Sequence, residues 1–133
     1  MKKIKKTFLP FTLMVLFLIF VTGCSMGMNS SSINPSSWII GTWSDNTDTM
    51  CFVFSSDNVI QESTGLRIDF KEALEAESSV TYNETSNATT YSINMNDSSG
   101  AGTYTFTKTS NTTLDYTISS SGITVGPIEL TKE

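Results

Sequence analysis

The sequence has no histidine and only two cysteines, Cys24 and Cys51, in 133 residues. Hydrolytic triads use a general base that is usually histidine, and zinc sites need clusters of Cys or His, so neither kind of site is expected. No Gly-rich phosphate loop is present either, because Gly100-Ala101-Gly102 leads into a predicted strand rather than a helix. These absences predict a protein that is not an enzyme and carries no cofactor and no metal.

Basic residues are scarce outside the N-terminus. Four of the eight Lys and Arg residues lie within residues 1–6, and no acidic residue precedes Asp45. Without residues 1–23 the chain keeps four basic residues against thirteen acidic ones, a formal charge of −9. Such a surface repels nucleic acid and anionic lipid headgroups, because both bind clustered Lys or Arg. The charge therefore predicts no nucleic-acid partner.

Carboxylates are the remaining candidates for chemistry. Asp45 and Asp48 lie near one predicted loop, and Glu72, Glu75 and Glu77 lie on a predicted helix. Two carboxylates can serve glycoside hydrolysis, or can bind calcium together with loop carbonyls. Their spacing matches no EF-hand loop, and charged residues usually lie on the solvated surface. We therefore interpret them as surface residues.

The N-terminal segment has the organisation of an export signal. Residues 1–6 are basic, and residues 8–22 form an apolar run. This run is shorter than the roughly 20 apolar residues that a transmembrane helix needs, and its size is typical of a signal peptide. An uncleaved membrane anchor is the alternative interpretation.

Val21, Thr22, Gly23 and Cys24 follow the apolar run and resemble the lipobox of bacterial lipoproteins. That pattern is an aliphatic residue, a small residue, Gly or Ala, and then Cys. The resemblance implies that the signal peptidase recognises the first three residues and removes residues 1–23. It also implies that the Cys24 sulfur carries a diacylglyceryl group, and two or more acyl chains give stable membrane anchoring.

Residues 24–37 are predicted to be the lipidated cysteine and a flexible tether, because residues 25–37 have neither periodicity nor charge. Thirteen such residues would reach about 20 Å from the membrane by coil statistics. By resemblance to the sorting rules of enteric bacteria, Ser25 does not retain the protein at the inner membrane. An outer-membrane or cell-surface location in the bacterial envelope follows from that rule.

The remaining residues, 38–133, are predicted to form one all-β domain. Apolar and polar residues mostly alternate, and the joints are rich in Ser, Asn, Asp and Gly. The predicted strands are 38–43, 49–54, 59–62, 80–83, 89–96, 102–108, 113–119 and 123–130. The pattern predicts a small antiparallel up-and-down barrel of about eight strands. Residues 66–77 are predicted to be a short amphipathic helix that packs on one end of the barrel, with a lid or partner-binding helix as the alternative.

Bulky side chains are predicted to fill the interior of this barrel. The inward candidates are Trp43, Phe52, Phe54, Tyr91, Ile93, Tyr104, Phe106, Tyr116 and Ile118. An eight-stranded barrel is only wide enough for its own side chains or one small ligand, so a packed core is expected and a small-molecule ligand is not. Cys51 has no intrachain partner if Cys24 is lipidated. We interpret it as a small apolar residue, with a reactive or intermolecular thiol as the alternative.

Gly41-Thr42-Trp43 resembles the Gly-X-Trp signature of lipocalins and the wider calycin group, in which the Trp closes one end of the barrel. An ordinary core aromatic is the alternative for Trp43. Residues 52–58, 102–108 and 128–132 are similar to small lipocalin-like lipoproteins of spirochaetes and similar bacteria. The missing catalytic motifs and the expected packed core predict a membrane-anchored, non-enzymatic binding module with a protein or glycan partner. The alternative is a lipocalin-like carrier of a small apolar ligand.

Overall fold

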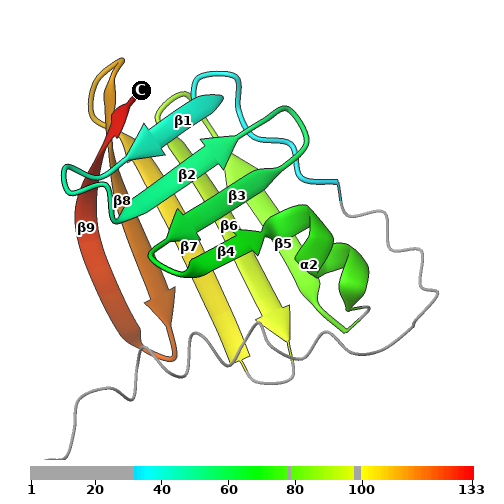
Figure 1. The fold of residues 1–133 in the computed structure, drawn as a ribbon. Helices are drawn as coiled ribbons and strands as arrows, with labels where there is room; N and C mark the ends of the chain where they lie inside the picture. Colours follow the sequence, from blue (N-terminus) through cyan, green and yellow to red (C-terminus); the bar gives the residue numbers. More distant parts are fainter. Residues whose placement is uncertain (1–31, 78, 98–99) are drawn as a thin grey trace, which may run out of the picture.

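The computed structural model describes residues 32–77, 79–97 and 100–133, which form one curled antiparallel sheet and one short helix (Figure 1). The strands are β1 (Gly41–Ser44), β2 (Met50–Phe54), β3 (Val59–Ser63), β4 (Leu66–Asp69), β5 (Thr81–Ser86), β6 (Thr90–Asp97), β7 (Gly100–Lys108), β8 (Thr113–Ser120) and β9 (Ile123–Lys132), and the helix is α2 (Phe70–Ala76). Their order in the sheet is β4-β3-β2-β1-β9-β8-β7-β6-β5. The first and last strands pair, and β4 and β5 are the two edges. The all-β prediction is confirmed, in an open, barrel-like form.

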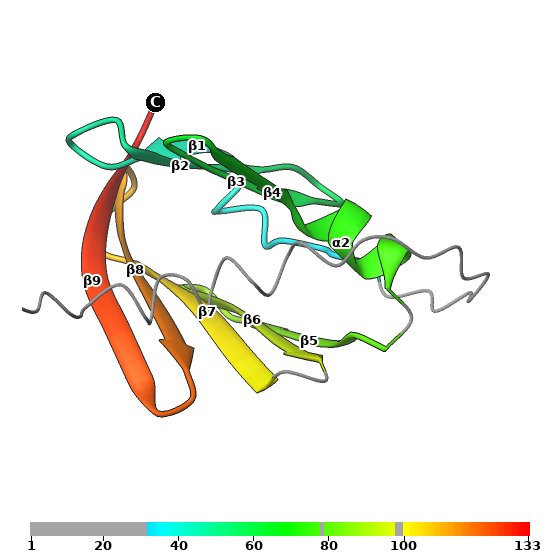
Figure 2. The same ribbon diagram turned by 60° about the horizontal axis from the view of Figure 1, so that its bottom comes forward.

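The two halves of the sheet face each other (Figure 2). The short-strand layer consists of β1–β4, with four or five residues in each strand. The long-strand layer consists of β5–β9, with six to ten residues in each strand. Only Trp43 and Ser44 of β1 pair with β9, so a short ladder joins the two layers.

The sheet has nine strands where about eight were predicted, and the helix is shorter than the predicted 66–77. Residues Leu66–Asp69 form β4 and pair with β3 after a turn at Gly65, whose φ is +77°. The exposed Arg67 and the buried Ile68 alternate as a strand requires. The helix begins only after Asp69, whose side chain accepts a hydrogen bond from the N–H of Glu72. An acidic N-cap followed three residues later by Glu is a helix-start signal in the sequence.

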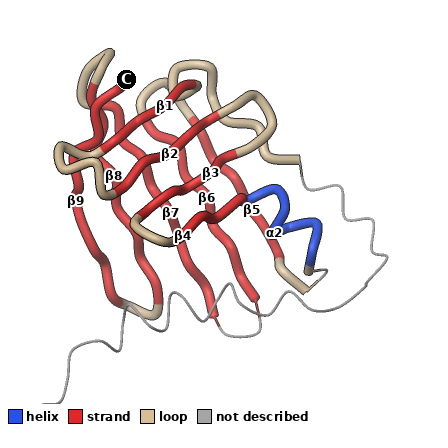
Figure 3. Tube along the Cα trace, viewed as in Figure 1, coloured by secondary structure: helices blue, strands red, loops and turns tan. Residues whose placement is uncertain are grey.

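Strand dominates the trace, and the helix lies where the chain passes from β4 to β5 (Figure 3). The Phe70 side chain of α2 is buried, with its ring centroid 5.1 Å from that of Tyr104. Leu74 also packs against the core. The helix therefore covers its own core, as the preferred interpretation of this segment predicted.

The packed interior is confirmed. All nine predicted inward side chains are buried, and aromatic rings from both layers meet at the centre. The ring centroid of Phe106 lies 5.0 Å from that of Phe52, 5.0 Å from that of Phe54 and 5.1 Å from that of Tyr116. Such edge-on and stacked contacts stabilise a core beyond the burial of area alone.

A bulge interrupts the pairing of β8 with β9 between Tyr116 and Ile118. It depends on Gly126, which has a φ of +113°. A Cβ atom at this position would lie 2.6 Å from the carbonyl oxygen of Tyr116, so no other residue fits without a shift of the backbone.

Candidate functional site

The predicted lipidation site and its recognition residues, Cys24 and Val21, Thr22 and Gly23, lie outside the described residues. The functional features that can be located are therefore those of the β-rich domain. They are the interior, the segment that enters the domain, the loops and the outer face of the sheet.

The entering segment, residues 33–39, packs on the domain. Ile33 and Ile39 are buried, although residues up to 37 were predicted to be a flexible tether. The backbone N–H of Asn34 donates to both oxygens of the Glu84 carboxylate, at 3.2 and 3.1 Å. The indole N–H of Trp38 donates to the carbonyl of Asn87 at 2.9 Å. Among the described residues, the packed part of the chain thus already includes Ile33, which lies before Trp38.

A pocket of about 410 Å³ lies beside this segment. It is lined by Asn34, Pro35, Ser36, Ser37, Ile40, Ser56 and Ser86. None of the nine inward side chains lines it, and Ser37, Ser56 and Ser86 are exposed. It is therefore an open depression at the surface and differs from the axial cavity in which a lipocalin-type carrier would hold its ligand.

Two tyrosines and a carboxylate meet beneath the entering segment. The hydroxyls of Tyr82 and Tyr91 are buried, next to each other and to the Glu84 carboxylate. Burial, reinforced by the nearby Glu84 carboxylate, raises the pKa of both phenols. They therefore stay protonated at neutral pH and cannot act there as general bases. Gln61 is a third inward polar residue, 5 % exposed, and its Oε1 lacks a partner among the described residues.

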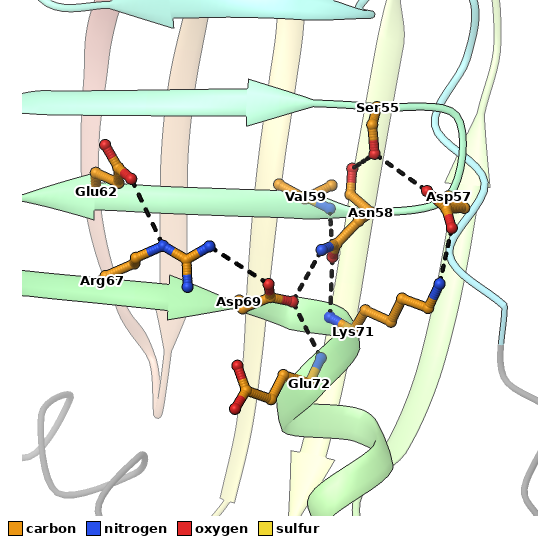
Figure 4. A network of polar contacts seen from close by, with 9 residues as sticks. All are labelled: Ser55, Asp57, Asn58, Val59, Glu62, Arg67, Asp69, Lys71 and Glu72. Atoms are coloured by element: carbon orange, nitrogen blue, oxygen red, sulfur yellow. Dashed lines mark hydrogen bonds and ion pairs between the residues drawn. The ribbon is translucent and has the colours of Figure 1, made fainter.

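A network of polar contacts ties the β2–β3 turn to the start of α2 (Figure 4). The Asn58 amide donates to Asp69 at 2.8 Å, and its oxygen accepts from the backbone N–H of Val59 and of Lys71, at 2.8 and 3.0 Å. Burial alone would raise the pKa of Asp69. The N–H of Glu72 and the Asn58 amide outweigh that effect, so this pKa lies below its ordinary value. The network positions the helix.

Arg67 belongs to the same network. Its guanidinium lies 3.6 Å from Glu62 and 3.6 Å from Asp69. The cation beside Trp43 is Lys132 of β9, with Nζ 5.4 Å from the ring centroid. The Trp43 indole N–H donates to the carbonyl of Ile39 at 2.8 Å, which fixes the entering segment against β1.

Asp45 organises the β1–β2 loop. Its carboxylate accepts hydrogen bonds from the hydroxyls of Thr47 and Thr49, both at 2.7 Å, and from the N–H of Thr49 at 2.9 Å. Burial would raise its pKa, but these bonds lower the pKa to about 2. The oxygens are thus engaged within the loop. Within residues 32–77, 79–97 and 100–133, no three Asp, Glu, His or Cys side chains are placed to hold a metal ion.

Cys51 is a half-buried free thiol in β2. Burial raises its pKa, and the negative charges of Glu133, Glu62 and Asp48 raise it further. Because the thiolate is the nucleophile, this environment opposes the reactive-thiol alternative.

The outer Thr/Ser/Asn face is the surface of β6–β8 that points away from the core. It consists of Thr90, Ser92, Asn94, Thr103, Thr105, Thr107, Thr113, Thr117 and Ser119. Neighbouring strands are linked across it: the Ser92 and Thr105 hydroxyls are 2.9 Å apart, and the Asn94 amide donates to Thr103 at 2.7 Å. This surface offers uncharged hydrogen-bond donors and acceptors, and the carboxylate of Asp115 lies on the same face, between Thr113 and Thr117.

No helix in the described part of the chain has the length and apolar character needed to cross a bilayer. Comparison with family models, curated proteins and solved structures returned no match to this chain.

Proposed function

We propose that this chain is a bacterial lipoprotein whose lipocalin-like β-domain acts as a non-enzymatic binding module. Signal peptidase removes residues 1–23, and lipid on Cys24 holds the domain at the outer membrane or cell surface. The anchor is supported by the sequence of the N-terminal segment, in which a basic stretch is followed by a short apolar run and then by the four residues Val21 to Cys24.

Substitution of Cys24 tests the anchor. Cys24→Ala should abolish incorporation of labelled fatty acid and leave the precursor uncleaved, because both steps depend on the thiol. Cys51→Ala is the matched control and should be acylated and cleaved as the natural chain is. Acylation and cleavage of the Cys24→Ala chain at the same place would contradict the proposal.

The filled core is the observation that carries the binding-module interpretation. Both layers contribute aromatic rings to the centre of the barrel, and the pocket beside Asn34 is open at the surface and lies outside that centre. A partner therefore has to contact the exterior of the domain. We assign it to the outer Thr/Ser/Asn face, which fits an uncharged hydrogen-bonding surface of a protein or glycan and does not attract nucleic acid.

Capture from envelope or host extract tests this assignment. Thr105→Lys places a charge at the centre of the outer Thr/Ser/Asn face, and Ser56→Lys places the same charge at the pocket. We expect the natural chain and Ser56→Lys to capture the same partner and Thr105→Lys to lose it, with all three chains melting as folded domains. Loss of the partner with Ser56→Lys alone would contradict the assignment and would locate binding at the pocket.

A further inference from the structure

The two edges of the sheet differ in how well they are protected against pairing. The β4 edge has four residues, carries Arg67 with its ion pairs to Glu62 and Asp69, and runs directly into α2. The β5 edge has six residues, and none of them is Lys, Arg or Pro. Natural proteins usually protect long edges with such residues or with bulges, because an open edge is a template for another strand.

The β5 strand is regular along its whole length. It pairs with β6 without a bulge from Thr81 to Ser86, and within the described part of the chain it is the last strand of the sheet. Its outward side chains, Thr81, Asn83 and Thr85, are exposed and uncharged. Among the described residues, no strand pairs with its other backbone edge.

We propose that β5 pairs in antiparallel fashion with β5 of a second copy of this chain, about a twofold axis at Asn83. Residues directly opposite each other must point to the same face of the joint sheet. An odd-numbered residue of one copy therefore lies opposite an odd-numbered residue of the other, and an even-numbered residue opposite an even-numbered one. An axis at Asn83 places Thr81 opposite Thr85 and Tyr82 opposite Glu84. An axis at Glu84 would instead place two carboxylates directly opposite each other, which is unfavourable.

The pairing about Asn83 is self-complementary in chemistry as well as in register. Hydroxyl and amide side chains meet on the outer face, where no charge is present. On the inner face Tyr82 lies opposite Glu84, the only carboxylate of the strand, so the two Glu84 carboxylates do not lie directly opposite each other. The outer faces of the two long-strand layers become continuous across the joint. Six residues make a small interface, so the pairing is weak and transient in solution.

Cross-linking tests the register. In a Cys51→Ser background, the full chain is given a cysteine at Asn83 or, as the control, at Thr105, which lies on a strand paired on both sides. Membranes are treated with a short bis-maleimide, and the background chain without an added cysteine reports any reaction at Cys24. We expect a dimer with Asn83→Cys and none above background with Thr105→Cys. Equal yields at the two positions, or cross-links only to another protein, would overturn the proposal.

Opposite charges test the twofold axis. Two differently tagged copies of the full chain are co-expressed, and their association in the membrane is measured by energy transfer between fluorophores on the two tags. When both copies carry Asn83→Lys, or both carry Asn83→Glu, association should fall by roughly fivefold, because like charges then face each other. One copy of each should restore it. Undiminished association of like-charged copies, or no recovery in the mixed pair, would overturn the proposal, and melting temperatures confirm that each variant is folded.

Discussion

The short-strand layer and the long-strand layer enclose the same core but are stabilised in different ways. Strands of four or five residues form short ladders, and the short-strand layer adds hydrogen-bond networks at its ends, around Asp45 and around Asn58. The long-strand layer is stabilised by continuous ladders of up to eight residue pairs, with neutral side-chain bonds across its outer face. Loop carboxylate and amide side chains therefore fix the ends of the first layer, whereas hydroxyl and amide side chains link neighbouring strands across the outer face of the second.

We expect the largest loss of stability from a substitution in the core that both layers share. Phe106→Ala removes a ring in contact with rings of both layers and should lower the free energy of unfolding by about 3–5 kcal/mol. Thr105→Ala, the next residue on the outer face, should cost less than about 1 kcal/mol. Urea unfolding of the two variants measures the difference. Similar costs would mean that the outer face is structural too.

We expect the second largest loss of stability from a substitution in the entering segment. Ile33→Ala removes a side chain that is 2 % exposed and should cost about 2–4 kcal/mol. Ser37→Ala, at an exposed position four residues later, is the control and should leave stability unchanged within about 0.5 kcal/mol. A negligible effect of Ile33→Ala in urea unfolding would show that the segment contributes as little as a flexible tether.

Asn58 tests whether polar networks position the short-strand layer. Asn58→Ala removes three hydrogen bonds, two of which join the β2–β3 turn to the start of α2, and should cost about 1–2 kcal/mol. Lys71→Ala removes only the exposed ion pair with Asp57 and should cost less than about 0.5 kcal/mol. Thermal melts with both variants separate the two contributions. Equal losses would assign the stability to surface charge rather than to the buried network.

We expect the smallest loss of stability at Asp45, and this loss depends on pH. The folded pKa of Asp45, about 2, lies below its ordinary value of 3.8, so its charge stabilises the fold above about pH 4. That stabilisation is lost as the pH falls from about 4 through 2. At pH 7 Asp45→Asn should cost up to about 1 kcal/mol, after allowance for solvent screening, and the gap from the natural chain should close over that window. Asp48→Asn is the control, because Asp48 has a φ of +54°, which Asn tolerates. A gap that persists at pH 2 would contradict the assigned cause.

The alternation of apolar and polar residues was enough to predict the strand class and all nine buried inward side chains. Leu66 was misassigned because Leu66, Phe70 and Leu74 also match a helical period, and only the Gly65 turn and the Asp69 cap separate strand from helix. Ile33 was missed because a single apolar residue in a Ser-rich segment has no periodicity. The polar contacts of Glu84 and Asn58 join residues distant in sequence, so local patterns cannot predict them. Cys24 was assigned from a local motif, and that assignment stays a prediction.

Native mass spectrometry of the full chain, extracted from bacterial membranes in mild detergent, tests the proposed function most directly. The measured masses identify the N-terminal residue, the covalent lipid and any bound small molecule in one experiment. A lipid-anchored module with a filled core predicts a polypeptide that begins at Cys24, carries covalent acyl chains and retains no stoichiometric small ligand. A chain that keeps residues 1–23 without acyl groups would contradict the anchor, and a stoichiometric apolar ligand released on gentle activation would contradict the filled core.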